Sequence, residues 1–151
     1  MEYRNVIMIT FTVVLLLLTA CRQTFQYASN KPYLMTQWHK YQLLIPILIY
    51  PHSRVDNIKI KTIDNKRRII VDILIMRDFK EIFNFYLNYY KDFARKNKLD
   101  FHVYKDVFIS GITLRRTPKE KEVIFMILLF HKKTNKGYRI GIMSTLKESN
   151  K

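Results

Sequence analysis

The chain has 151 residues, of which 48% are hydrophobic and 14% aromatic, so it can bury the core of one compact domain, which argues against wholesale disorder. Its formal net charge of +15 favours partners that carry negative charge. The single cysteine excludes an internal disulfide and any zinc site built on several thiolates.

An apolar run over residues 6–18 follows a short polar start and leads into Leu18, Thr19, Ala20 and Cys21. The run is shorter than the roughly 20 residues that a membrane-spanning helix needs. Its length is typical of a secretory signal. Two small residues stand before the cysteine, where a signal peptidase requires access to the backbone.

These four residues resemble the bacterial lipobox, Leu-(Ala/Ser/Thr)-(Gly/Ala)-Cys, and match it at each position. The resemblance implies a signal peptide over residues 1–20, cleavage between Ala20 and Cys21, and an N-acyl diacylglyceryl group with palmitate on Cys21. It also implies localisation in a bacterial cell envelope. Arg22 after the cysteine resembles signals for sorting to the outer membrane, if the cell has two membranes.

Two alternatives for the apolar run are an uncleaved membrane anchor and a buried core helix. Arg22, Lys31 and Lys40 outnumber the bases before the run. For an uncleaved anchor, the positive-inside rule would therefore favour a basic cytoplasmic domain. The complete match to the lipobox favours the lipoprotein.

After Cys21, the sequence predicts a tether through residue 40 with a short ordered piece at 33–38, one domain over residues 41–144, and a flexible tail over 145–151. Pro46 within the apolar segment 43–50 predicts an edge strand or the start of a strand. Residues 55–63 and 67–76 have strand patterns and flank turn residues at 64–66, which predicts a hairpin.

Apolar residues spaced three and four apart from Phe79 to Ala94 predict an amphipathic helix of about five turns. Asp78 is suited to cap its amino end, and the bases at 95, 96 and 98 favour its carboxyl end. Phe85 and Tyr89 lie off the apolar stripe, four residues apart. We expect them to cover a sheet edge or to bind a partner.

Residues 101–114 predict a strand with a bend at Ser110 and Gly111, and residues 122–130 and 138–143 predict two further strands. The order is β-β-α-β-β-β. It predicts an α+β fold, with a mostly antiparallel sheet of about five strands and one long amphipathic helix packed on one face.

This order resembles that of small uncharacterised envelope lipoproteins. Tyr50-Pro51-His52-Ser53 is similar to their Tyr-Pro-Gly-(Ala/Ser) motif, and Phe85-Tyr86 to the Phe-Tyr of their helix. His52 stands where their motif has glycine, and Lys98-Leu99 where theirs often has Gly-Trp. The resemblance supports the fold and implies no catalytic residues.

The sequence indicates no catalytic residues, no cofactor and no metal site. Its glycines are isolated, its histidines lack metal-ligand spacing, and its serines lie outside any nucleophile motif. We therefore expect a protein that is not an enzyme.

The basic excess is the remaining indication of function. It gathers at predicted hairpin turns, in Lys66, Arg67, Arg68, Arg115, Arg116, Lys132 and Lys133. One interpretation is a solvated basic surface that reflects composition, and the other is attraction to anionic lipid or an envelope polymer. Nucleic acid is disfavoured because export removes the chain from it.

Together these observations predict a lipid-anchored, non-catalytic binding or scaffold module at an anionic membrane surface. One alternative is a lipoprotein subunit of a secretion or envelope-spanning machine, with a protein partner in that complex. The other is the uncleaved anchor with a basic cytoplasmic domain.

Overall fold

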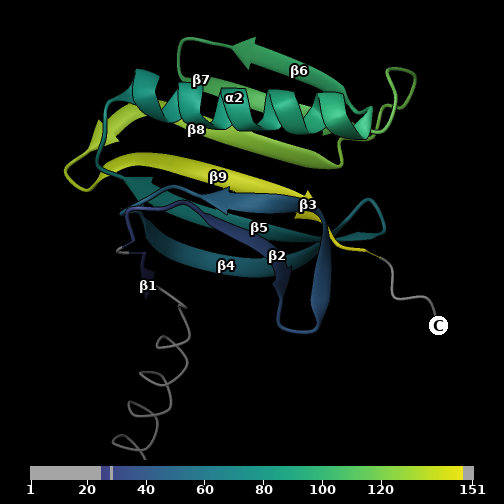
Figure 1. Ribbon diagram of the computed structural model, residues 1–151, viewed down its shortest axis with the longest axis horizontal. Helices are drawn as coiled ribbons and strands as arrows, with labels where there is room; N and C mark the ends of the chain where they lie inside the picture. The colour runs from purple at the N-terminus through teal and green to yellow at the C-terminus, as the bar shows by residue number, and fades with distance from the viewer. Residues whose placement is uncertain (1–24, 28, 148–151) are drawn as a thin grey trace, which may run out of the picture.

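The computed structural model describes residues 25–27 and 29–147. A seven-stranded sheet has the order β1-β4-β5-β9-β8-β7-β6, and a second sheet is the hairpin of β2 and β3 (Figure 1). The elements are β1 Phe25–Gln26, β2 Tyr33–Trp38, β3 Tyr41–Ile49, β4 Arg54–Ile63, β5 Lys66–Ile75, α2 Phe79–Asn97, β6 Asp100–Lys105, β7 Ile109–Arg115, β8 Phe125–Thr134 and β9 Gly137–Thr145.

Every strand pair in both sheets is antiparallel. The predicted mostly antiparallel α+β fold is therefore confirmed, with one long helix among the described residues. The expected count of about five strands was too low, since the large sheet has seven strands, or six without the two-residue β1.

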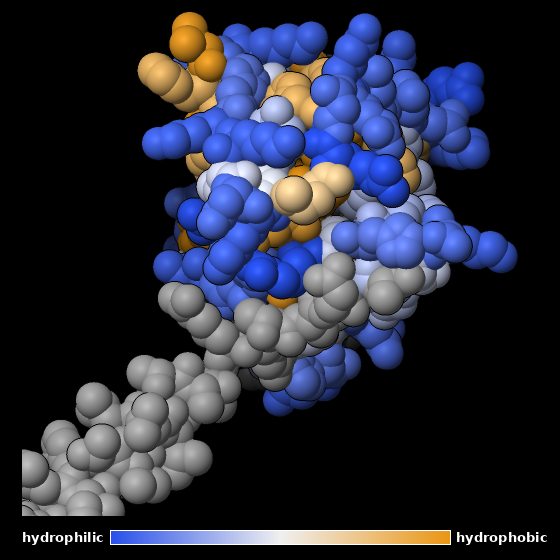
Figure 2. All heavy atoms as spheres, turned by 90° about the vertical axis from the view of Figure 1, so that its left-hand side faces the viewer, coloured by the Kyte–Doolittle hydropathy of each residue, from blue (hydrophilic) through white to orange (hydrophobic). Residues whose placement is uncertain are grey.

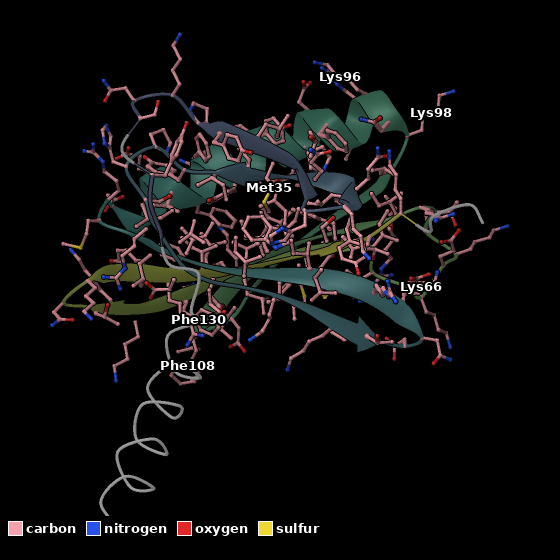
Figure 3. The ribbon with its side chains drawn as sticks, turned by 90° about the horizontal axis from the view of Figure 1, so that it is seen from below. Met35, Lys66, Lys96, Lys98, Phe108 and Phe130 are labelled. Carbon is pink, nitrogen blue, oxygen red and sulfur yellow. The ribbon has the colours of Figure 1, made fainter. Side chains whose placement is uncertain are left out.

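The helix and the β2–β3 hairpin form one layer over one face of the large sheet, as Figures 1 and 3 show. The ring of Tyr90 on α2 packs 4.4 Å from that of Phe125 on β8. Its hydroxyl donates to the carbonyl of Pro46 and accepts from the N–H of Leu48, both at 3.0 Å. Met35 lies between the hairpin and the sheet and is 2% exposed. The apolar core fills the space between these layers.

The helix agrees with its prediction at both ends. The Asp78 side chain accepts from the N–H groups of Lys80 and Glu81, so it is the N-cap. Lys98 closes the other end in a left-handed conformation, and its N–H is directed at the last carbonyls of the helix. Local signals were sufficient here because capping and amphipathic spacing act within a few residues.

The fold is larger at both ends than the predicted domain. Residues 33–38 form β2, which pairs with β3, so this part of the predicted tether belongs to the fold. At the carboxyl side, Leu146 is 5% exposed and bridges to Leu43, so the fold continues past residue 144. Sequence reasoning missed β2 as a full strand because Met35 is its only buried side chain.

The segment 101–114 is two strands and not one bent strand. The turn lies at residues 106–108, where the Asp106 carboxylate accepts from the N–H of Val107. Ser110 and Gly111, the predicted bend, lie inside β7. Gly111 faces the ring of Tyr104 across the pair, and a Cβ there would stand 2.1 Å from that ring. The glycine therefore makes room for an aromatic ring and marks no turn.

The strand directions give the sheet two distinct ends. One, the β1 end, holds β1 with the start of β4, the end of β5, the β8–β9 turn and the β6–β7 turn. The other, the Glu122 end, holds the β4–β5 turn, the β7–β8 connection and the carboxyl end of the helix (Figure 1). In the described part of the chain, no helix has the length and apolarity to cross a membrane.

Candidate functional site

Ala20 and Cys21, the predicted cleavage and lipidation residues, lie outside the described residues. β1 begins at Phe25, so only residues 22–24 separate it from Cys21. An extended chain covers at most about 14 Å over that interval. β1 pairs with the first residues of β4, Arg54 and Val55. A lipid on Cys21 would therefore hold the β1 end close to the membrane.

The structure separates the seven predicted anionic-surface residues into two groups. Lys66, Arg67, Arg68, Arg115 and Arg116 gather at the Glu122 end, and Lys132 and Lys133 lie near the β8–β9 turn at the β1 end. The length of the sheet therefore separates the two groups.

At the Glu122 end the bases surround one carboxylate. The ammonium group of Lys66 lies 2.6 Å from the carboxylate of Glu122, and the guanidinium of Arg68 lies 3.9 Å from the same carboxylate. The hydrogen bond from Lys66, followed by the attraction of Arg68 and Arg116, lowers the pKa of Glu122. This carboxylate therefore partly neutralises the cluster.

Arg68 differs from the other predicted anionic-surface residues because its side chain is buried. It is only 5% exposed, and its guanidinium also lies 3.6 Å from Asp64. The side chain therefore contributes to the fold. Arg67 and Arg116 remain exposed, while Lys66 and Arg115 are half-buried.

The β1 end carries bases without such neutralisation. Lys132 and Lys133 are exposed, and no ion pair joins either one to another residue in the described part of the chain. Lys133 lies over the ring of Tyr138, 5.8 Å from its centroid. This end therefore offers accessible positive charge on the side from which the predicted anchor would extend.

A feature that the sequence analysis missed lies at the same end. The β6–β7 turn presents Val107 and Phe108, which are 76% and 74% exposed. Figure 3 places Phe108 on the outer side of the sheet, near Phe130. Two adjacent apolar residues after Asp106 were the available signal, but they were assigned to the interior of a strand.

His131 on β8 holds this turn in place. Its Nδ1 lies 2.8 Å from the carbonyl of Val107, and its backbone N–H donates to the carbonyl of Phe108. Its Nε2 lies 2.9 Å from the hydroxyl of Ser110. Such a serine–histidine contact also occurs at catalytic sites, but Ser110 is 2% exposed, so a substrate cannot reach its hydroxyl. The contact positions the turn.

Phe85 and Tyr89, the predicted partner face, are half-buried within this domain. Phe85 packs 4.7 Å from Tyr50 at the end of β3, and Tyr89 packs 4.9 Å from Tyr90. Burial also raises the pKa of the Tyr89 hydroxyl. Much of the surface of both rings is therefore used inside the fold.

A hollow of about 680 Å³ lies over the outer face of the sheet near the β1 end. Ion pairs form part of its wall, Arg54 with Asp56 at 2.6 Å and Arg139 with Asp72 at 3.5 Å. Both carboxylates in this wall are thus already bound by arginines. Among the described residues, no three His, Cys, Asp or Glu side chains lie close enough together to hold a metal ion.

His52 stands where the motif that this segment resembles has glycine. Its φ is +53°, in the left-handed region that favours glycine. The residue thus adopts the backbone conformation that the glycine of the motif would provide.

No protein-family model, curated protein or solved structure matches the chain.

Proposed function

We propose that the chain is a lipid-anchored, non-catalytic protein of the bacterial envelope, whose domain is a binding or scaffold module at an anionic membrane surface. The observation that carries the proposal is the complete lipobox match at residues 18–21, which contains the only cysteine. The short distance from Cys21 to β1 agrees with a domain held next to the bilayer. Outer-membrane sorting in a two-membrane cell is part of the proposal, because Arg22 follows the cysteine.

The two groups of bases take different roles in this proposal. The β1 end faces the bilayer, and Lys132 and Lys133 lie next to anionic headgroups. Arg67 and Arg116, at the far end of the sheet, face away and are available to an anionic envelope polymer or a protein partner. One basic surface that reinforces the anchor along its whole length does not fit this geometry.

Metabolic labelling with an alkyne palmitate analogue tests the anchor directly. The wild-type chain and Cys21→Ala are compared for label and for distribution between membrane and soluble fractions. We expect label on the wild type only, with the variant left unprocessed or lost from the membrane. An unlabelled wild type that stays membrane-bound at full length would overturn the proposal in favour of the uncleaved anchor.

A second candidate is a subunit of a secretion or envelope-spanning machine. It is favoured by β6, the edge strand of the large sheet, where Val103 and Tyr104 are each 40% exposed. An edge strand can accept a further strand from a partner. Crosslinking in cells tests this with Val103→Lys, using Phe85→Ala/Tyr89→Ala to probe the helix. Loss of one defined partner from Val103→Lys alone would support recruitment through β6.

A further inference from the structure

The β6–β7 turn exposes two large apolar side chains at its tip. Val107 and Phe108 are the most exposed large hydrophobic residues of the described chain. Figure 2 faces the β1 end and shows hydrophobic atoms standing out at its upper left, among hydrophilic side chains. Adjacent apolar side chains that are exposed together make this tip a candidate contact for an apolar environment.

Several polar backbone groups of this turn are already hydrogen-bonded within the protein. The Asp106 carboxylate accepts from the N–H of Val107, and the carbonyls of Val107 and Phe108 accept from His131. The N–H of Asp106 donates to the carbonyl of Ile109 at 2.8 Å. Polar backbone groups must be paired when a segment leaves water for lipid. The turn can therefore enter an apolar phase without losing hydrogen bonds to water at these groups.

The charges near the tip have the sign that an anionic bilayer requires. Lys105 precedes the turn, and Lys132 and Lys133 follow His131 on β8. Asp106 is the acid of the turn itself, and its carboxylate is bound to the backbone. Lysines next to an inserted apolar residue can reach lipid phosphates from the headgroup region.

The position of the predicted anchor favours a lipid bilayer as the apolar partner of the β6–β7 tip. β1 and the β6–β7 turn lie on opposite edges of the sheet but at the same end of its strands. A flat surface placed against this end can therefore contact both. Since residues 22–24 allow only about 14 Å between Cys21 and β1, a lipid on Cys21 would bring its bilayer to the end of the sheet at which the tip also lies.

The geometry points to a second membrane contact: Val107 and Phe108 insert into the headgroup region of the anchoring bilayer, and Lys105, Lys132 and Lys133 bind its anionic phospholipids. This inference rests on the proposed lipid anchor. With two contacts on opposite edges, the domain is held in one orientation, and the Glu122 end faces away from the membrane.

The test places a reporter at the tip and uses the sole tryptophan, Trp38, as the matched control. Trp38 ends β2 and pairs with Tyr41, whose hydroxyl accepts from Arg67, so Trp38 lies toward the Glu122 end of the sheet. The full chain is reconstituted into phosphatidylethanolamine and phosphatidylglycerol vesicles with brominated acyl chains, as wild type and as Trp38→Phe/Phe108→Trp. Bromine quenches tryptophan emission only at short range.

We expect loss of emission and a blue shift for tryptophan at position 108 and unchanged emission for Trp38. Emission at 108 that is unchanged in the vesicle-bound chain, or equal quenching at both positions, would overturn the inference. Hydrogen exchange of the wild type is a second measurement without substitution. Exchange at residues 106–109 should slow in these vesicles, while exchange at the Asp64-Asn65 turn should stay constant.

The labelling and quenching experiments distinguish a failure of the lipid-anchor proposal from a failure of the proposed membrane contact of the tip. Quenching at position 108 in a chain that takes no palmitate label would remove the lipid anchor and support the membrane contact of the tip. Label on Cys21 without quenching at position 108 would support the lipid anchor and overturn the proposed membrane contact of the tip. A protein partner covering Val107 and Phe108 would produce this second result.

Discussion

Both ends of the sheet carry basic side chains, but the two groups differ in burial and in ion pairing. At the Glu122 end, Lys66 and Arg68 share a carboxylate, and Arg68 is almost completely buried. At the β1 end, Lys132 and Lys133 are exposed, and no ion pair joins them to another described residue. Large apolar side chains are also exposed at the β1 end, at positions 107 and 108.

This contrast shows that a count of bases does not locate a binding surface. A paired, partly buried cation is already compensated, and an incoming anion must compete with its carboxylate. An exposed lysine retains its full attraction for an anionic surface. The difference predicts that substitutions at the Glu122 end change stability, whereas lysine substitutions at the β1 end change membrane contact.

The largest effect on stability should come from the residue that builds the β6–β7 tip. His131→Ala removes the hydrogen bonds to Ser110 and Val107 and an edge contact with the ring of Phe79 at 4.8 Å. The buried Ser110 hydroxyl then loses its partner, and we expect the free energy of unfolding to fall by about 2–3 kcal/mol. Urea unfolding of the full chain measures this change.

The matched control for that experiment is His102→Ala. His102 is exposed on β6 and lies 2.7 Å from the carboxylate of Asp100. A surface pair of this kind contributes little, so we expect a change within about 0.5 kcal/mol. Equal losses from the two variants would show that the tip is not specifically held by His131.

The next effect concerns the exposed lysines. In the chain with tryptophan at position 108, Lys132→Gln/Lys133→Gln removes two charges, each contributing about 1 kcal/mol at an anionic membrane surface. We therefore expect the docked fraction of the tip to fall, with a shift of its equilibrium by roughly 30-fold. Quenching by brominated lipid, measured against salt concentration, follows this shift.

The control pair is Arg67→Gln/Arg116→Gln, which removes the same charge from the Glu122 end. The tip should remain quenched in this variant because both arginines face away from the bilayer. If the two pairs reduced quenching equally, net charge alone would explain membrane contact, and the distinction between the ends would be wrong.

Glu122→Gln should lower the free energy of unfolding by a smaller amount. This change leaves Lys66, Arg68 and Arg116 without their shared carboxylate, and we expect a loss of about 1–2 kcal/mol because the site is only partly exposed. Thermal or urea unfolding measures it. Glu120→Gln, in the same connection, should change stability by less than about 0.5 kcal/mol.

The same carboxylate predicts a pH dependence. The hydrogen bond from Lys66 and the nearby arginines hold the pKa of Glu122 below its value in the unfolded chain. Its contribution to stability is therefore complete above the unfolded pKa, near 4.5, and is lost as pH falls through the lower folded pKa. Unfolding at acidic pH should show a shallower loss of stability in Glu122→Gln than in the wild type. Identical slopes would contradict this role.

How far the sequence predicted the fold depended on the range of the interactions involved. The helix and its Asp78 cap were predicted because their hydrogen bonds and spacing are local. The ordered piece at 33–38 was predicted, but its pairing with β3 as the strand β2 was not, because that pairing and the burial of Met35 depend on distant residues. The β6–β7 hairpin was missed because the glycine near it accommodates Tyr104 and marks no turn. Neither contact leaves a periodic pattern in its own segment.

By itself, the sequence determined the mostly antiparallel α+β class, the helix with its ends, and the residues that carry positive charge. Only the tertiary structure decided which bases are compensated, because Glu122 meets Lys66 through strand pairing far along the chain. It also decided that Val107 and Phe108 are exposed, since the hydrogen bonds of His131 come from another strand. Burial and pairing depend on distant residues that meet only in the folded chain, whereas charge and helical spacing are properties of the chain itself.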